Sequence, residues 1–161
     1  MASVQVKHQP ARTRPARVKV QSQGASNGFV EIGRELTRSS AMQRVDLIRR
    51  GVDVVVFLKA QKHYDVTRAR MAKLVGLSEV TVGRKIKSKS KLGPLESERL
   101  VRIAMIEAEA EQIFGSRDAA KHWMLSSNLA LGESPLSLMD TDAGAGEVRK
   151  VLNSIAYGGV A

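Results

Sequence analysis

The sequence contains no cysteine, and this absence excludes a disulfide framework, a thiolate metal site and a cysteine nucleophile. Its three histidines, His8, His63 and His122, do not have the spacing of metal ligands. Aromatic residues make up only 4% of the 161 residues, so a core must be built from Val, Leu, Ile, Met and Ala. That composition favours helices over a β-sandwich or barrel. The length allows one ordinary domain, or two very small ones that share a core.

The sequence also lacks the features of a membrane protein and of an enzyme. No stretch approaches the roughly 18 apolar residues of a membrane span, and MASVQVKHQP has no signal-peptide core, so we expect a cytoplasmic protein. No nucleophile stands beside a base, and no metal cluster or phosphate-cradling glycine loop occurs. Gly144-Ala145-Gly146 is too short and isolated for a dinucleotide site. We therefore predict a binding protein without catalytic residues, metal or cofactor.

Positive charge is abundant but unevenly distributed, with a net charge of +10. Residues 1–30 hold five basic and no acidic residues, and residues 61–91 hold nine basic against two acidic. Residues 92–161 instead hold six basic against ten acidic residues. This division predicts a polyanionic partner for the first part and a different partner for the second. Simple solvation of the surface by lysines is the alternative.

Local patterns outline the first half of the chain. Residues 1–39 are predicted to be a flexible basic arm, because residues 2–28 are rich in Gln, Arg, Pro and Ser with little apolar periodicity. A helix should run from Ser40 to Gly51, with Met42, Val45, Leu47 and Ile48 on one side. The β-branched stretch VDVVVFLKAQK is ambiguous by periodicity, and its place between helical segments favours a helix.

The segment DVTRARMAKLVGLSEVTVGRKIKSKSKL has the pattern of a helix-turn-helix. Thr67 is placed to cap a first helix that buries Met71, Ala72, Leu74 and Val75 and ends at Gly76. Ser78 is placed to cap a second helix that buries Val82 and Ile86.

The second helix of such a unit enters the DNA major groove, with its first side chains towards the base edges and flanking lysines on phosphates. A helical hairpin with a purely structural role is the alternative. The predicted DNA-binding residues are Ser78, Glu79, Val80, Thr81, Arg84, Lys85, Lys87 and Lys89.

Three further helices are expected beyond Pro94. The first covers PLESERLVRIAMIEAEAEQIFG, with Leu95, Leu100, Ile103, Ile106, Ala110, Ile113 and Phe114 buried. Ser116 is placed to cap the next, whose His122 and Trp123 are expected in the core. Thr141 is placed to cap a last helix from about residue 142 to 157, which aligns Val148, Val151, Leu152 and Ile155.

The run from Gly115 onwards resembles the toxin-binding domain of the Xre/MbcA/ParS family of antitoxins, and LGPLESERLVRIA resembles the family's linker to its helix-turn-helix. The resemblance covers roughly residues 40–161. Glu133 stands where the family often has a second glycine, and Met139 where leucine is usual. The matching residues are Phe114-Gly115-Ser116, Ala119-Ala120, Trp123-Met124, Asn128, Ala130-Leu131-Gly132, Ser134-Pro135-Leu136, Leu138-Met139, Thr141, Gly144, Val148, Leu152, Ile155 and Gly158.

This resemblance implies an all-α protein with an Xre-like helix-turn-helix domain at residues 40–93 and a small helical toxin-binding domain at residues 94–161. It implies a type II antitoxin whose C-terminal region covers the active site of an NAD-degrading RES-type toxin. Binding to operator double-stranded DNA, as a homodimer that represses its own operon, is also implied. The expected toxin-binding residues are Glu147, Arg149, Lys150, Asn153, Ser154, Tyr157 and Gly158.

Two points stay open at this stage. A homodimer, which operator recognition by a helix-turn-helix normally requires, would form its seam through residues 52–58 or the long helix from Pro94. The alternative function is a free-standing helix-turn-helix transcriptional repressor, whose C-terminal domain serves only for dimerisation.

Overall fold

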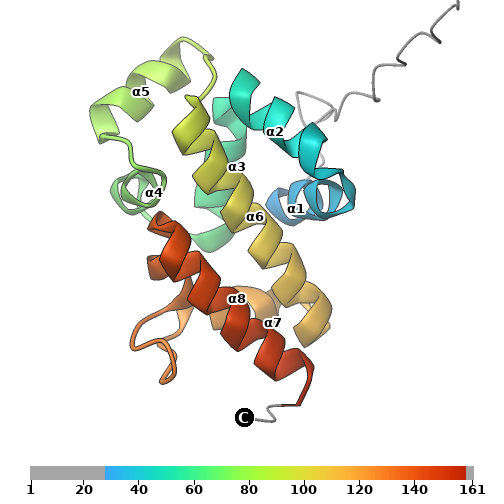
Figure 1. Cartoon of the computed structure of the whole chain (residues 1–161). Helices are drawn as coiled ribbons and strands as arrows, with labels where there is room; N and C mark the ends of the chain where they lie inside the picture. The colour runs from blue at the N-terminus through green and yellow to red at the C-terminus, as the bar shows by residue number, and fades with distance from the viewer. Residues whose placement is uncertain (1–27, 159–161) are drawn as a thin grey trace, which may run out of the picture.

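The computed structural model describes residues 28–158, and it is helical throughout that part of the chain (Figure 1). The all-α prediction is therefore confirmed. The elements are α1 (Phe29–Arg38), α2 (Ala41–Arg50), α3 (Val54–Tyr64), α4 (Arg68–Val75), α5 (Glu79–Lys87), α6 (Pro94–Phe114), α7 (Arg117–Leu125), the 3-10 helix η1 (Pro135–Asp140) and α8 (Asp142–Ala156).

Helices α2 and α3 begin and end where the local sequence indicates. The Ser40 hydroxyl accepts a hydrogen bond from the Gln43 backbone N–H, and the Gln43 side chain accepts one from Ser40, which forms a complete capping box. Gly51 ends α2 at a φ of 80°. The ambiguous stretch that follows is the helix α3, as its context indicated. On α2, however, only Leu47 is buried, and Met42 is 64% exposed.

The predicted flexible arm is wrong for its last part, because α1 is a helix that packs along α6. Residues 1–27 of that arm lie outside the described residues. Gly33 allows the close approach of the two helices, since a Cβ there would overlap the carbonyl oxygen of Ala104. Arg34 adds an ion pair, with its Nε 3.0 Å from Glu111 Oε2. Tertiary packing, which local composition does not encode, therefore orders this segment.

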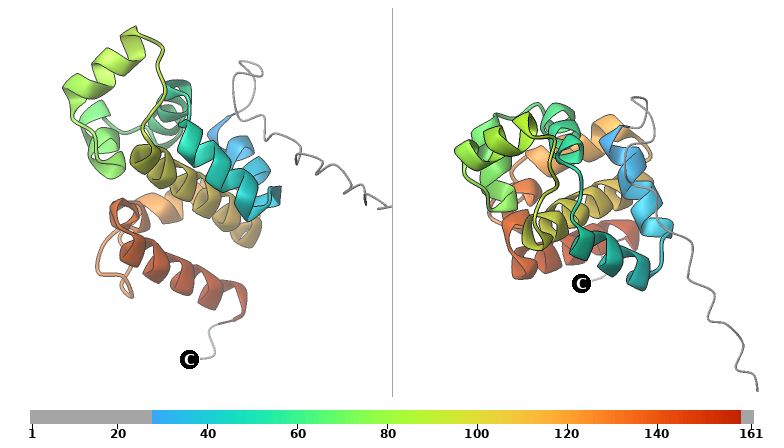
Figure 2. Two further views of the ribbon diagram at one scale, coloured as in Figure 1. Left: turned by 45° about the horizontal axis from the view of Figure 1, so that its top comes forward. Right: turned by 90° about the horizontal axis from the view of Figure 1, so that it is seen from above.

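The long helix α6 lies at the centre of the molecule and packs against α1, α2, α3, α4, α7, α8 and η1 (Figure 2). Most of its predicted apolar face is buried or half-buried, but Leu95 is 59% exposed. Buried polar Ser97 accepts a hydrogen bond from the Val52 backbone N–H at 2.8 Å. This bond fixes the start of α6 against the junction of α2 and α3.

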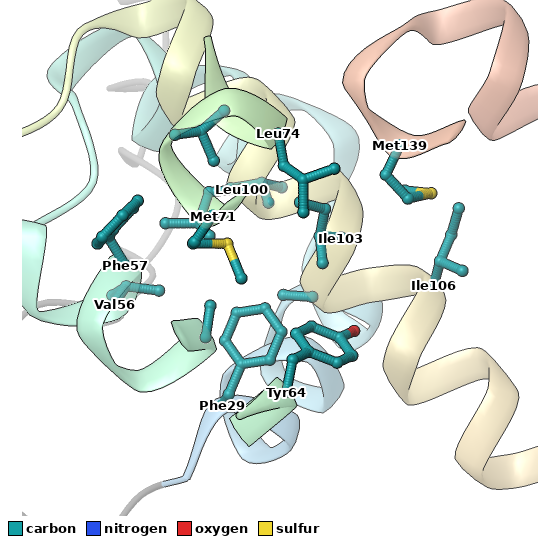
Figure 3. Close-up of a cluster of buried hydrophobic side chains, with 14 of the residues drawn as sticks. Phe29, Val56, Phe57, Tyr64, Met71, Leu74, Leu100, Ile103, Ile106 and Met139 are labelled. Atoms are coloured by element: carbon teal, nitrogen blue, oxygen red, sulfur yellow. The ribbon is translucent and has the colours of Figure 1, made fainter. Parts of the chain in front are cut away.

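One hydrophobic cluster runs from α1 to α8. In Figure 3, Met71 and Leu74 of α4 point towards Leu100 and Ile103 of α6. Met139 of η1 lies further along the same cluster. The core is thus continuous across residue 94, and the predicted domain boundary there stays a prediction.

Most apolar side chains of the predicted dimer seam at residues 52–58 are buried, but Val55 is 49% exposed. Val52, Val54, Val56 and Phe57 are at most 5% exposed and belong to the chain's own core. Helix α6 is also covered on most sides by its neighbours. Val55 and Leu95 are the exposed large apolar residues of the two predicted seams, and the homodimer stays a prediction.

A buried polar cluster joins α3 to α6. The Glu107 carboxylate, fully buried, accepts a hydrogen bond from the Tyr64 hydroxyl at 2.7 Å, and lies 2.8 Å from His63 Nε2. Phe29 of α1 packs against both rings. Burial, together with the negative charge of Glu107, raises the pKa of Tyr64 well above its ordinary value. The satisfied carboxylate therefore links α3 to α6, and the ring contacts of Phe29 add α1 to the cluster.

Candidate functional site

Helices α4 and α5 form the predicted hairpin. The Thr67 hydroxyl accepts a hydrogen bond from the Arg70 backbone N–H, and the Ser78 hydroxyl accepts one from that of Thr81, each at 3.2 Å. Gly76 ends α4 in the left-handed region at a φ of 78°. Ala72 and Val82 are buried between the helices. The predicted caps, turn and inward residues are all confirmed, except that Ile86 is only half-buried.

The eight predicted DNA-binding residues lie together, on α5 or directly beside it. Val80 is 84% exposed, so its side chain is free to contact a partner. Ser78 and Thr81 are partly engaged in the cap, where their hydroxyls lie 2.9 Å apart. Lys85 is half-buried and donates to the Lys91 carbonyl at 2.7 Å, so its ammonium is turned to the chain's own backbone. The remaining members, Glu79, Arg84, Lys87 and Lys89, are exposed.

Within the described part of the chain, the basic residues of this region have no carboxylate partner. Eight of the nine between Lys62 and Lys91 are exposed, Lys85 being the exception. Every ion pair found in residues 28–158 uses other side chains, on α1, α3, α6, α7 and α8. The surface around α4 and α5 therefore carries uncompensated positive charge. We name this set the basic surface: Lys62, Arg68, Arg70, Lys73, Arg84, Lys87, Lys89 and Lys91.

Lys89 has a strained backbone. It follows α5 at a φ of 49°, in the left-handed region where glycine is the usual residue. The Ser90 backbone N–H donates to the Lys85 carbonyl at 3.0 Å, which closes the end of the helix. A lysine in this left-handed conformation lowers the free energy of unfolding by roughly 1 kcal/mol relative to glycine. Its side chain is nevertheless placed on the basic surface.

Helix α7 and the loop after it form the start of the second candidate surface. The Ser116 hydroxyl accepts a hydrogen bond from the Ala119 backbone N–H at 3.1 Å, which confirms that cap. Trp123 is half-buried, with its ring centroid 5.6 Å from that of Phe114. The expectation of a core position is wrong for His122, which is exposed on the outer side of α7 and lies 3.3 Å from the Ser126 hydroxyl.

Helix α8 begins as predicted, because the Thr141 hydroxyl accepts a hydrogen bond from the Gly144 backbone N–H at 3.1 Å. Val148 and Leu152 are fully buried. Ile155, predicted to align with them, is 43% exposed because the last turn of α8 extends beyond the body of the molecule (Figure 1).

The predicted toxin-binding residues lie on the outer side of α8 and at its end. Six of them are exposed, and Tyr157 is 84% exposed. Lys150 Nζ lies 2.6 Å from Glu147 Oε1 on the helix surface. The seventh, Arg149, is half-buried and pairs with Glu109 of α6 at 3.3 Å, so it also holds α8 to the core.

Sequence reasoning missed two exposed apolar residues in this region, Ile155 and Leu129. Helical periodicity aligned Ile155 with the buried residues and gave no signal that the helix outruns its support. For Leu129, the neighbouring Asn128 and the turn at Gly132 indicated a loop, and an apolar residue within a loop was the available signal.

Residues 28–158 contain no group of three or more His, Cys, Asp or Glu side chains that could hold a metal ion. In the same part of the chain, no helix is both long and apolar enough to cross a bilayer.

Two family models match the chain, one after the other. The antitoxin Xre-like helix-turn-helix domain matches residues 43–105, and the antitoxin Xre/MbcA/ParS C-terminal toxin-binding domain matches residues 109–158. A curated protein named Antitoxin Xre, from Yersinia enterocolitica serotype O:8 / biotype 1B, is 28% identical over 130 residues, which are 80% of this chain and 86% of the relative. Another Antitoxin Xre, from Photorhabdus laumondii subsp. laumondii, is 26% identical over 114 residues, 70% of this chain and 77% of the relative.

These matches agree with the fold. The first model covers α4, α5 and their supporting helices, and the second begins within α6 and ends with α8. An Xre-like helix-turn-helix followed by a toxin-binding domain is the arrangement of a type II antitoxin, and the chain belongs to the Xre/MbcA/ParS family of antitoxins.

Proposed function

We propose that this antitoxin neutralises a RES-domain, NAD-degrading toxin by covering its active site with the C-terminal region, and that it represses its own operon by binding DNA. One observation carries the proposal. The basic surface and the exposed end of α8 lie at opposite ends of one continuous core (Figure 1). Two partners of different chemistry can therefore bind the same chain without competing.

The proposal for DNA rests on the exposure and charge of α5. Its N-terminal turn presents Val80 and Glu79, and Arg84 lies one turn further along. A guanidinium can bind guanine through two hydrogen bonds, and an apolar side chain can contact a thymine methyl group. The lysines after α5 would contact phosphates, which supplies affinity without sequence information.

The proposal for the toxin rests on the end of α8. Tyr157 and Ile155 are exposed there, beyond the part of the helix that packs on α6. A cleft that binds a dinucleotide must attract phosphates, and residues 92–161, with ten acidic against six basic residues, complement positive charge around such a cleft, although the outer side of α8 itself carries Glu147, Arg149 and Lys150. Tyrosine also supplies a large contact area at little conformational cost.

We further propose that the chain acts on its operator as a homodimer. A helix-turn-helix usually recognises two half-sites about 34 Å apart with two copies of the protein. Light scattering of the purified chain near micromolar concentration should give twice the mass of 17.5 kDa. A monomer, both alone and with the toxin, would contradict this part of the proposal.

A mobility-shift assay on the chain's own promoter tests the DNA function. Arg84→Ala should weaken binding to the promoter by roughly 5- to 150-fold if Arg84 reads a guanine, and should relax the preference at that base pair. Lys87→Gln should instead lower affinity equally for promoter and random DNA. Absence of any shift, with and without the toxin, would refute DNA binding.

Growth rescue tests the toxin function. Cells that express the protein encoded by the adjacent reading frame should stop growing and lose NAD, and the full chain should restore both. Deletion of residues 156–161 should reduce the rescue and leave the promoter shift unchanged, because the basic surface is remote from that end. If the adjacent frame encodes no toxin and the promoter still shifts, the chain is a free-standing repressor instead.

A further inference from the structure

Leu129 is fully exposed, at 103% of the accessible surface of an isolated residue. It lies in the loop of residues 127–133, between α7 and η1. A large apolar side chain with no neighbour contributes nothing to the core, and exposure to water gives it no favourable interaction. A single exposed leucine is common on protein surfaces, but the Leu129 side chain is wholly available to a partner outside the chain.

The loop that carries Leu129 is held in one conformation by its own hydrogen bonds. The Asn128 side chain accepts a hydrogen bond from the Ala130 backbone N–H at 2.9 Å. The Asn128 backbone carbonyl accepts one from the Gly132 backbone N–H, also at 2.9 Å. The Asn128 backbone N–H donates to the Glu133 carbonyl at 3.1 Å. Gly132 takes the left-handed conformation, at a φ of 77°. A preorganised loop loses little entropy when it binds.

Exposed apolar residues are few in this part of the molecule. Residues 109–158, which match the toxin-binding family model, present three large ones: Leu129, Ile155 and Tyr157. The last two belong to the end of α8. In Figure 1 and in the left view of Figure 2, the loop lies at the lower edge of the molecule, below α4 and beside the start of α8, and the end of α8 reaches the same edge further along. One partner could therefore contact both.

We infer that the loop of residues 127–133 is a second contact surface for the toxin, with Leu129 as its apolar anchor. This inference rests on the function proposed above and adds a docking contact to the covering of the active site. In this arrangement the loop binds outside the toxin's cleft and positions the end of α8 over it. Complete burial of a leucine side chain at an interface would strengthen binding to the toxin by roughly 10- to 150-fold.

The test is the affinity of the full chain for the protein encoded by the adjacent reading frame, measured by titration calorimetry. Leu129→Ser should weaken binding at least about tenfold, and Leu129→Met, which keeps the apolar volume, should bind nearly as the unchanged chain. Asn128→Ala, which frees the loop, should weaken binding by a smaller factor. Promoter binding should be unchanged in all three, because the loop is remote from α5.

Leu95→Ser is the matched control. Leu95 is also exposed, at 59%, but lies outside residues 109–158, so its replacement should leave toxin affinity unchanged. If Leu129→Ser binds normally while Tyr157→Ala binds weakly, the loop is no contact, and the proposed function stands without it. An equal loss with Leu95→Ser would also overturn the inference. Failure of the unchanged chain to bind would refute the proposed function itself.

Discussion

The salt dependence of DNA binding follows from the unpaired charge of the basic surface. Lys87, Lys89 and Lys91 are exposed at the end of α5 and have no carboxylate partner within residues 28–158. If each contacts one phosphate in both copies of a dimer, six contacts form. A lysine that binds phosphate releases counterions from the DNA, and each contact changes the slope of log K against log salt by about −0.9.

Six contacts predict a slope of about −5. Affinity should accordingly fall roughly 2,000-fold between 50 and 200 mM salt. Lys87→Gln removes one contact from each copy, so the slope should become shallower by about 2. Fluorescence anisotropy of a labelled promoter duplex, at four or five salt concentrations, gives the slope directly.

Lys150→Gln is the control for this measurement. Lys150 is also exposed but lies on α8, where it pairs with Glu147. Its replacement changes the net charge by the same amount and should leave the slope unaltered. A slope shallower than about −2 for the unchanged chain, or the same effect from both substitutions, would refute the assignment of the basic surface to DNA.

Three further predictions concern stability. Gly33→Ala should lower the free energy of unfolding in urea by about 1–3 kcal/mol, because the new Cβ would overlap the Ala104 carbonyl. Gly83 has open space around it, so Gly83→Ala should stabilise α5 by about 0.5–1 kcal/mol. Equal effects of the two substitutions would contradict the packing of α1. Tyr64→Phe should cost about 1–3 kcal/mol by removing a donor to buried Glu107. Because the pKa of Tyr64 is raised in the folded state, its contribution to the free energy of unfolding is present below about pH 10 and is lost as the pH rises above that value. The unfolding temperature should therefore fall less steeply at alkaline pH for Tyr64→Phe than for the unchanged chain. Lys89→Gly should raise stability by up to roughly 1 kcal/mol while weakening DNA binding, and a loss of stability would show that the left-handed backbone is not strained.

Elements set by local signals could be predicted from the sequence. Ser40, Thr67, Ser78, Ser116 and Thr141 each cap a helix through a hydroxyl within three residues of the amide that it binds. Because capping depends on a few adjacent residues, the starts of these helices were correct. The grouping of the DNA-binding candidates on one helix followed from those boundaries.

Elements set by contacts between distant segments could not be predicted. Gly28 provides no side-chain cap for α1, and the burial of that helix depends on close packing of Gly33 with α6, some 70 residues further along. The carboxylate of Glu107 meets Tyr64 across a separation of 43 residues. Similarly, no periodicity indicated that Ile155 lies beyond the support of α6. Such features depend on how the helices pack, which a single sequence pattern does not specify.

The central claim is that the end of this chain closes the toxin's active site. The most direct measurement is NAD consumption by the purified protein from the adjacent reading frame, titrated with the full chain and with a chain that ends at residue 155. The full chain should stop NAD consumption at a fixed molar ratio. The shortened chain should still bind, through contacts upstream of residue 156, and leave most of the activity. Equal inhibition by the two chains would contradict the claim.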